Sequence, residues 1–275
     1  MVANSPADTC GGPRAVRPAV GKGVQPSVEA AAAVSAQAEP VREGNLNSGA
    51  PLIEIVSATR LSKSDFEKNS ALGISLQRLG YDRRLIARVK YENKAGLPTV
   101  YNEAISAGNI HNVLVFMHDD VWIDDFFFAD RIIEGLRQYD MIGVAGNRRR
   151  VKNQPAWAFV DLKLTHDDGS NLSGSVAHGK SPFGRVTFFG PVPADCELLD
   201  GVLIAAKRAT LMLNGVKFDP QFDFHFYDMD VCRRARAAGL RLGTAAVCLT
   251  HQSVGAFGTP AWTENYFNYM RKWVD

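Results

Sequence analysis

Three ionisable residues, His118, Asp119 and Asp120, directly follow an apolar segment at residues 113–117 that is typical of a buried strand. Burying charge costs free energy, so ionisable groups at the exit of such a strand indicate a function. Two adjacent carboxylates repel each other unless a cation or solvent relieves them. Hard divalent cations prefer oxygen ligands and often share them with phosphates. We therefore predict that Asp119 and Asp120 help to bind Mn²⁺ or Mg²⁺; the alternative is that one of them only caps the next turn.

A second pair of carboxylates, Asp228 and Asp230, lies where an aromatic-rich segment at residues 222–227 turns into a helix. Carboxylates at a helix N-terminus are stabilised by free N–H groups and by the helix dipole, so one of the two is expected to be a cap. A carboxylate held ionised in an aromatic-walled cleft is also a good general base for a hydroxyl. We interpret Asp228 as that base.

His251 is a third candidate, because it follows the last apolar segment, residues 242–249. A lone histidine is more often structural, but at a strand exit it can ligate a metal or contact phosphate. Of the other histidines, His178 has the strongest case because it lies in a glycine-rich region. Several basic residues can either neutralise a diphosphate or remain solvated: Arg148, Arg149, Arg150, Arg271 and Lys272.

Alternating strands and helices must position these residues. Strands are predicted for the segments 52–56, 85–89, 113–117, 141–145, 200–206 and 242–249. Helices are predicted for residues 64–79, 99–107, 124–139, 228–238 and 262–273. This alternation predicts an α/β domain with a mostly parallel central sheet flanked by helices. Ligands of such sheets bind outside the carboxyl ends of the strands, where residues 57–60, 92–94 and 118–120 are expected to meet.

The chain divides into two parts of different composition. Residues 1–50 contain no aromatic residue and are rich in Ala, Pro, Gly, Ser and Val, which predicts a disordered extension. Residues 51–275 are predicted to form a single domain. Within it, residues 147–197 have short β-like pieces and many glycines, so we interpret them as hairpins and loops that form a substrate wall.

The overall composition of the 275 residues excludes several classes of protein. A formal charge of +2 and a pI near 8.3 give no electrostatic case for nucleic acid as the main partner. Four cysteines without close pairing argue against a structural zinc site and for a reducing compartment. No apolar run reaches the roughly 18–20 residues that cross a bilayer. We therefore expect a cytoplasmic protein, with peripheral membrane association left open.

The order of these motifs resembles the GT-A-fold, family-2-like nucleotide-sugar glycosyltransferases, and especially the bacterial branch known as the glycosyltransferase-like family. The resemblance covers the chain from Leu52 onward. It is carried by four strings in this order: His118-Asp119-Asp120, Leu199-Asp200-Gly201-Val202, Tyr227-Asp228-Met229-Asp230-Val231-Cys232-Arg233-Arg234, and the late His251. The resemblance implies a GT-A (Rossmann-like) fold.

The resemblance also implies roles for individual residues. Asp120, with Asp119, and the late His251 correspond to the metal-binding residues, and Asp228 corresponds to the base. The nucleotide-binding positions are Ser57, Thr59, Arg60, Glu92, Asn93 and His118. Further positions near the acceptor are His178, Asp200, Tyr227 and Asp230. Two residues depart from the family pattern: His118 stands where the family usually has Asp, and Tyr227 where it usually has Glu.

The implied reaction transfers a sugar from a nucleotide-sugar donor, expected to be a UDP-sugar, to an acceptor hydroxyl with inversion. The acceptor is a glycan, a lipid-linked molecule or a protein. One alternative is a non-catalytic nucleotide- or glycan-binding module derived from a transferase. A second is a sugar-nucleotide pyrophosphorylase, which would require a glycine-rich basic loop after the first strand where this chain has Ser57-Ala58-Thr59-Arg60.

Overall fold

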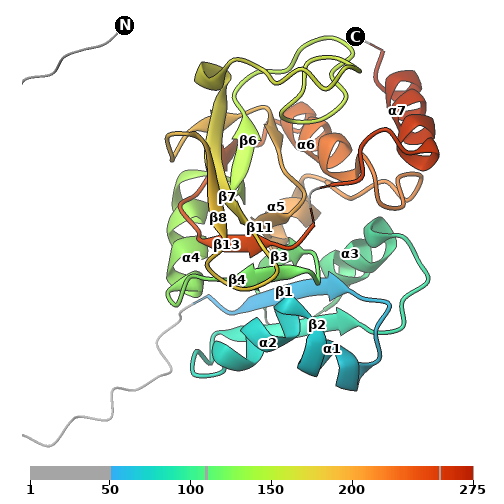
Figure 1. Ribbon diagram of the computed structural model, residues 1–275. Helices are drawn as coiled ribbons and strands as arrows, with labels where there is room; N and C mark the ends of the chain where they lie inside the picture. The colour runs from blue at the N-terminus through green and yellow to red at the C-terminus, as the bar shows by residue number, and fades with distance from the viewer. Residues whose placement is uncertain (1–50, 109–110, 254, 275) are drawn as a thin grey trace, which may run out of the picture. The chain divides into compact units, whose positions relative to one another are not determined.

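A seven-stranded sheet forms the centre of the domain in the computed structural model, which describes residues 51–108, 111–253 and 255–274 (Figure 1). The strand order is β2-β1-β3-β11-β5-β12-β9. Five of these strands run in one direction, while β9 and β11 run in the opposite one. Their bounds are β1 Ile53–Ala58, β2 Leu85–Lys90, β3 Val113–Met117, β5 Met141–Gly143, β9 Asp195–Cys196, β11 Leu203–Lys207 and β12 Leu242–Thr244. The predicted α/β domain with a mostly parallel sheet is confirmed; the extension predicted for residues 1–50 lies outside the described residues.

A second sheet has the order β10-β6-β7-β13-β4, with β8 paired to β7. Its bounds are β4 Val121–Ile123, β6 Ala145–Asn147, β7 Leu172–His178, β8 Arg185–Gly190, β10 Leu198–Leu199 and β13 Leu249–His251. Strand β13 pairs antiparallel with β4, so that His251 lies opposite Val121. It also pairs parallel with β7, so that His251 lies beside His178. This sheet therefore brings the late histidine to the turn that follows β3.

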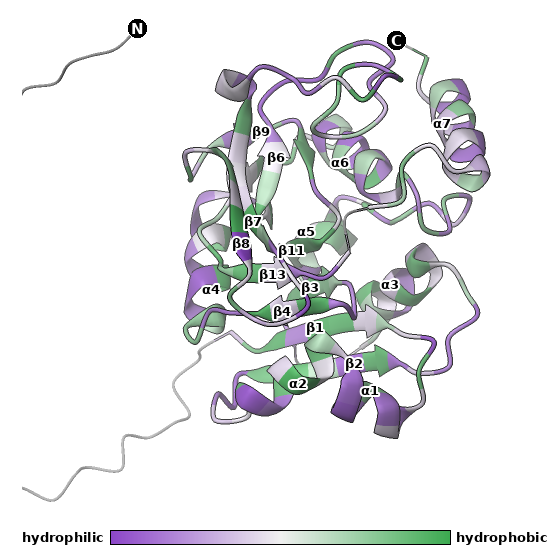
Figure 2. Cartoon of the chain, in the orientation of Figure 1, coloured by the Kyte–Doolittle hydropathy of each residue, from purple (hydrophilic) through white to green (hydrophobic). Residues whose placement is uncertain are grey.

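Seven α-helices occur in the described residues: α1 Lys63–Asn69, α2 Ala71–Arg78, α3 Leu97–Ser106, α4 Phe128–Gln138, α5 Arg208–Leu213, α6 Tyr227–Ala237 and α7 Pro260–Lys272, with a short 3-10 helix, η1 Gly169–Asn171. Helix α3 packs on β1 and β3, and α4 packs on β5 and β11. Helix α4 buries residues such as Ile132 and Leu136 and turns its hydrophilic residues outward (Figure 2). None of the described helices has the length and apolar character needed to cross a bilayer.

Three predicted elements are each divided in two. The helix predicted at residues 64–79 breaks at Ser70, where the backbone is extended. The Oγ of Ser70 caps the second half, α2, by accepting the N–H of Gly73. The strands predicted at 141–145 and 242–249 each cross from one sheet to the other. At the first crossing, Gly174 has φ +98°, and a Cβ there would lie 2.0 Å from the carbonyl oxygen of Val144. Only glycine fits this close approach of two chain segments.

A cluster of buried aromatic rings fixes the elements that carry the site. Tyr101 of α3 packs on Phe116 of β3 with ring centroids 4.9 Å apart, and Phe116 packs on Phe218 at the same distance. Tyr101 also contacts Tyr227 at the start of α6, at 5.9 Å. Because edge-to-face aromatic pairs have a preferred geometry, this cluster sets where α6 begins relative to the end of β3.

Helices α6 and α7 are joined by buried ion pairs. Asp230 is fully buried, and its Oδ1 lies 2.5 Å from Nζ of Lys272 and accepts the indole N–H of Trp273 at 2.7 Å. Arg234 lies 3.3 Å from the other carboxylate oxygen. Asp230 therefore holds the C-terminal helix and lies away from the cavity described below.

Replacing Asp230 by Asn is expected to lower the free energy of unfolding by about 3 kcal/mol, because it removes the fully buried carboxylate that pairs with Lys272 and leaves that ammonium only its ion pair with Asp219. Denaturant unfolding followed by circular dichroism measures this change. Asp195→Asn is the matched control, because Asp195 forms an exposed pair with Arg241, and such pairs contribute only about 0–1 kcal/mol. Equal losses in the two variants would contradict a structural role for the Asp230 pair.

Candidate functional site

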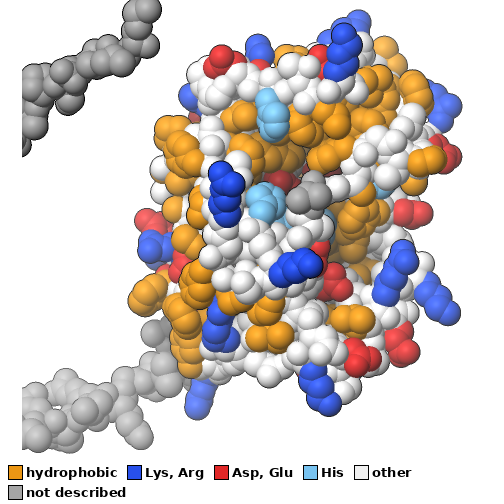
Figure 3. Space-filling model, viewed as in Figure 1, with side chains coloured by type: hydrophobic (Ala, Val, Ile, Leu, Met, Phe, Trp, Pro, Cys, Tyr) orange, Lys and Arg blue, Asp and Glu red, His pale blue; other side chains and the backbone are white. Residues whose placement is uncertain are grey.

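A cavity of about 560 Å³ opens at the carboxyl ends of β1 and β3. Figure 3 shows this face hollowed near its centre, where histidine and acidic side chains lie among hydrophobic ones. Concave sites of this size with a few polar groups in an apolar wall are typical of small-molecule binding. The predicted site residues that line the cavity are His118, Asp119, Asp120, His178, Asp200, Tyr227, Asp228 and His251.

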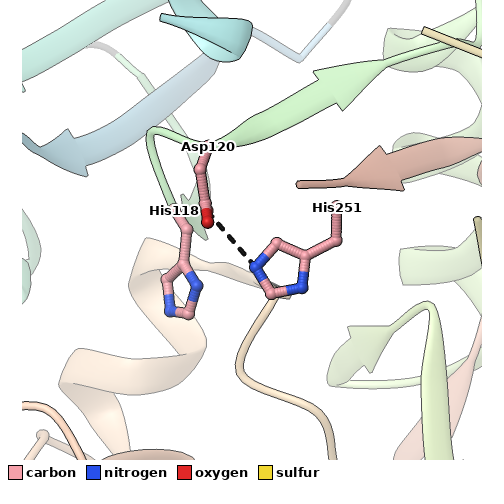
Figure 4. Close-up of side chains that lie close together, drawn as sticks. All are labelled: His118, Asp120 and His251. Carbon is pink, nitrogen blue, oxygen red and sulfur yellow. Dashed lines mark ion pairs between the residues drawn. The ribbon is translucent and has the colours of Figure 1, made fainter. Parts of the chain in front are cut away.

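His118, Asp120 and His251 form a compact cluster on one side of the cavity (Figure 4). One ligand atom from each lies within 4.8 Å of the others, and Nε2 of His251 lies 3.3 Å from Oδ1 of Asp120. The first two residues belong to the turn between β3 and β4, and His251 ends β13. Two imidazoles and one carboxylate in this arrangement can hold a divalent metal ion. Asp119 lines the cavity but lies outside this cluster.

The hydroxyl of Tyr227 fixes the tautomer of His118. This hydroxyl donates to the carbonyl oxygen of Gly201 at 2.9 Å, and it also contacts Nε2 of His118 at 2.8 Å. A carbonyl can only accept, so the single hydroxyl proton is used there. The Nε2–H of His118 must then donate to Tyr227, which leaves the lone pair of Nδ1 free to bind a metal. Tyr227 thus orients the imidazole of His118 from behind, the position that outer partners of metal-binding histidines commonly take.

The ionisation of the cluster suits metal binding. Burial opposes the charge on Asp120, but the hydrogen bond from His251, together with the nearby His251 and His118 rings and the Ser253 hydroxyl, outweighs it and lowers the pKa of Asp120 to about 2. Burial lowers the pKa of His118, which keeps this ring neutral. Burial also disfavours a charged His251, yet the bond to Asp120 raises the pKa of His251. A metal ion would replace the proton in that pair, because a bound cation and a bound proton compete for the same lone pair.

Asp228 lies half-buried in the first turn of α6, and its Oδ2 accepts the N–H of Gly201 at 3.2 Å. Burial, with the nearby charge of Asp200, raises the pKa of Asp228 to about 7. Phe226, immediately before the helix, has φ +67°, a left-handed conformation that costs a non-glycine residue free energy. This sharp turn starts the helix at the cavity, so the carboxylate is held there at a pKa suited to proton transfer near neutral pH.

Gly201 lies between Tyr227, which contacts His118, and the candidate base Asp228. A Cβ at this position would lie 2.5 Å from the hydroxyl of Tyr227 and 3.0 Å from Cβ of Asp228. Its carbonyl accepts from Tyr227 and its N–H donates to Asp228. His118, Tyr227, Gly201 and Asp228 are therefore connected by consecutive hydrogen bonds, which link the metal cluster to the candidate base.

Six of the predicted site residues do not line the cavity: Ser57, Thr59, Arg60, Glu92, Asn93 and Asp230. Ser57 and Thr59 are buried, and their neighbour Ala58 lines the cavity instead. Successive side chains of a strand point to opposite sides, so at the end of β1 the side chain of Ala58 faces the cavity and those of Ser57 and Thr59 do not. The candidate basic residues 148–150 and 271–272 also lie outside the lining.

Sequence reasoning missed an aromatic part of the cavity. Its lining includes Trp157, Phe159, Phe189, Phe257 and Trp262. Three of these lie within residues 147–197, the region predicted to form a substrate wall. Aromatic residues next to Gly and Pro in a region without clear periodicity were the available signal, but nothing in the spacing showed that they converge.

The chain was compared with protein families, with curated sequences and with solved structures. The sequence pattern of a family described as "Glycosyltransferase like family" matches residues 85–256. Among solved structures, the chain is similar to GalNAc-T7 with UDP, GalNAc and Mn²⁺, with 11% identity over 83% of this chain and 49% of that one and a TM-score of 0.48.

The chain is also similar to the catalytic domain of Drosophila β1,4-galactosyltransferase 7 in complex with xylobiose. The identity is 10% over 71% of this chain and 65% of that one, with a TM-score of 0.38. The chain thus spans 49% and 65% of the lengths of these two structures. No curated protein sequence matches the chain.

Proposed function

Because this chain belongs to the glycosyltransferase-like family, whose pattern matches residues 85–256, we propose that it transfers a sugar from a nucleotide-sugar donor to an acceptor hydroxyl. One observation carries this proposal: a single cavity contains both the cluster of His118, Asp120 and His251 and the half-buried carboxylate of Asp228. The first can bind the leaving diphosphate through a metal ion, and the second can take the proton of the acceptor. A UDP-sugar is the donor to test first.

The lining of the cavity favours a reaction that uses a divalent cation. No Lys or Arg is among the described residues that line it, although four aspartates are. A diphosphate would therefore meet a negative wall unless a cation lies between them. His118 through Nδ1, Asp120 and His251 fit such an ion, and their two imidazoles favour Mn²⁺ over Mg²⁺. A bound Mn²⁺ supplies Lewis-acid stabilisation of the charge that develops on the leaving diphosphate.

Asp228 acts as the general base in this proposal. Its Oδ2 is held by the N–H of Gly201, which leaves Oδ1 to accept the proton of the acceptor hydroxyl. The acceptor oxygen forms a bond to the anomeric carbon as the bond from that carbon to the diphosphate oxygen breaks. Attack from the face opposite the leaving group inverts the configuration, so a single base carboxylate is sufficient.

The direct test combines thermal shift with donor turnover across a panel of UDP-, GDP-, dTDP- and CMP-sugars, each with Mn²⁺, Mg²⁺ or EDTA. We expect one nucleotide to raise the melting temperature only with Mn²⁺, and its sugar nucleotide to be turned over. Stabilisation without any turnover, unchanged in Asp228→Asn, would instead indicate a non-catalytic binding module. If no nucleotide stabilises the protein with any metal, the proposed function is wrong.

The rate of transfer is expected to rise with pH through neutrality. With a pKa of about 7, Asp228 is protonated and inactive as a base at low pH and ionised at high pH. The rate should increase about tenfold per pH unit below pH 6 and level off above about pH 8. Initial rates between pH 5 and 8.5 at saturating donor measure this rise of the rate with pH. A flat profile, or an inflection near pH 4, would contradict the role of burial and of Asp200 in setting the pKa.

Replacing Tyr227 by Phe is expected to weaken Mn²⁺ binding by about 10–100-fold, the usual cost of losing an outer partner of a ligating histidine. The hydroxyl that fixes His118 is lost while the ring remains packed on Tyr101 and Phe218. Isothermal titration calorimetry with Mn²⁺ and nucleotide measures the effect. Tyr266→Phe is the control, because its hydroxyl bonds only to Asn153 among the described residues. Equal Mn²⁺ affinity in both variants would show that Tyr227 does not orient His118.

A further inference from the structure

The aromatic wall of the cavity, defined here as Trp157, Phe159, Phe189, Phe257 and Trp262, has no part in the cation or base chemistry. Trp157, Phe159 and Phe189 come from the region between β6 and β9, while Phe257 lies in the segment before α7 and Trp262 in the first turn of α7. All five line the same cavity as Asp228. A molecule that brings a hydroxyl to Asp228 would therefore contact this wall.

Contacts among its own rings hold the wall in place. Trp157 packs edge-on against Phe189 at 4.9 Å and 85°, and Phe159 packs edge-on against Phe257 at 5.2 Å and 89°. Trp262 stacks on Tyr266, which is not part of the wall, at 6.0 Å with an angle of 11° between the rings. Near-perpendicular pairs are a favoured aromatic geometry. The wall is therefore formed before a ligand arrives, which reduces the ordering cost of binding.

The charges in the cavity restrict what can bind beside the donor. The ionisable acids that line it are Asp119, Asp120, Asp200 and Asp228, and no Lys or Arg is among the described lining residues. In the proposed reaction a divalent ion held by His118, Asp120 and His251 would be occupied by the donor diphosphate. An acceptor with a phosphate, sulfate or carboxylate group would then meet like charges and lose its hydration without a counter-charge. The cavity thus favours an uncharged acceptor.

Polar imidazole side chains lie among the aromatic rings. His166 packs edge-on against Phe159 at 4.6 Å, and His178 and His225 also line the cavity. Each imidazole can donate or accept a hydrogen bond. A purely aliphatic acceptor chain would leave these groups unpaired, whereas a polyhydroxylated ring can bond to them. The C–H face of such a ring carries partial positive charge and matches the negative face of an aromatic side chain.

We propose that the acceptor is a neutral saccharide, whose ring stacks on the aromatic wall while one hydroxyl is presented to Asp228. This inference rests on the proposed transferase function and deepens it by naming the class of acceptor. It commits to a sugar ring that has both an apolar face and free hydroxyls. Uronic acids and sugar phosphates are excluded as preferred acceptors.

The test uses the tryptophan fluorescence of the full-length protein, since Trp157 and Trp262 belong to the wall. The protein with Mn²⁺ and the nucleoside diphosphate that stabilises it is titrated with lactose, cellobiose and N,N′-diacetylchitobiose. Glucuronic acid, glucose 6-phosphate and a Ser/Thr-rich peptide are titrated in parallel. We expect at least one neutral disaccharide to quench the fluorescence saturably, and to accept sugar from the matching donor.

Two matched pairs of variants locate the binding site. Phe189 lines the cavity, whereas its neighbour Phe188 lies on the opposite side of β8 and is 70% exposed. Phe257 lines the cavity, whereas Phe267 is exposed on α7. Phe189→Ala and Phe257→Ala should each weaken saccharide binding by about tenfold, with nucleotide binding unchanged. Phe188→Ala and Phe267→Ala should bind the saccharide like the unaltered protein.

The outcomes separate this inference from the proposed function. If nucleotide and Mn²⁺ bind but no neutral saccharide does, or if a charged sugar or the peptide binds more tightly, the saccharide inference is overturned and the transferase proposal stands. Equal losses in wall and control variants would overturn the stacking site. If no nucleotide binds, the failure belongs to the proposed function itself. Thermal unfolding of each variant confirms that it is folded before its affinity is compared.

Discussion

Replacing Asp228 by Asn is expected to lower the turnover of sugar transfer by about 10²–10⁴-fold, the range that general-base catalysis contributes. The amide has nearly the same shape and can still accept the N–H of Gly201, but it cannot take a proton from the acceptor hydroxyl. Because the carboxylate contributes to the transition state and not to donor binding, the nucleotide affinity should change little. Initial rates of nucleotide release and calorimetric titration with the nucleotide measure the two quantities separately.

Asp223→Asn is the control for this substitution. Asp223 belongs to the same aromatic segment and is exposed, but it does not line the cavity. Its replacement should leave both turnover and nucleotide affinity unchanged. If Asp228→Asn retained more than about a tenth of the turnover, the base would have to be another group in the cavity. Asp200 would then be the next residue to replace, since it lines the same cavity.

The strands that carry the site were predictable to different degrees. Residues 113–117 are an uninterrupted apolar run, and the observed β3 has the predicted bounds. By contrast, β4 and β13 have three residues each. Three residues are too few to show a periodicity, so only their pairing with neighbouring strands defines them. That pairing is what places His251 beside Asp120, and it is a property of the tertiary structure.

Some residues of the candidate site were also predictable from the sequence, and others were not. Asp120, His251 and Asp228 were identifiable because ionisable residues stood at the ends of apolar segments. The bond between His118 and Tyr227 joins positions 109 residues apart, and no spacing in the sequence could show it. These two residues are the departures from the family pattern, and the structure shows that they are partners. The imidazole and the phenol make a polar contact between the candidate metal cluster and α6.

Loss of the metal cluster is the second change expected to have a large effect. In Asp120→Ala, Mn²⁺-dependent nucleotide binding should weaken by more than about a hundredfold, because even the outer partners of metal ligands contribute 10–100-fold. The two remaining imidazoles would hold the ion without its anionic ligand. Calorimetric titration of nucleotide with Mn²⁺ present, and with EDTA as the metal-free reference, measures the loss.

The adjacent carboxylate provides a matched control for that prediction. Asp119 also lines the cavity, but it lies outside the cluster, so Asp119→Ala should retain Mn²⁺-linked nucleotide binding. Equal losses in the two variants would mean that the metal is held by both aspartates, as the sequence alone predicts. Nucleotide binding that persists in EDTA would be a stronger contradiction. With no Lys or Arg among the described lining residues, such binding would require the diphosphate to lie outside this cavity, and Asp228 could not then be the base.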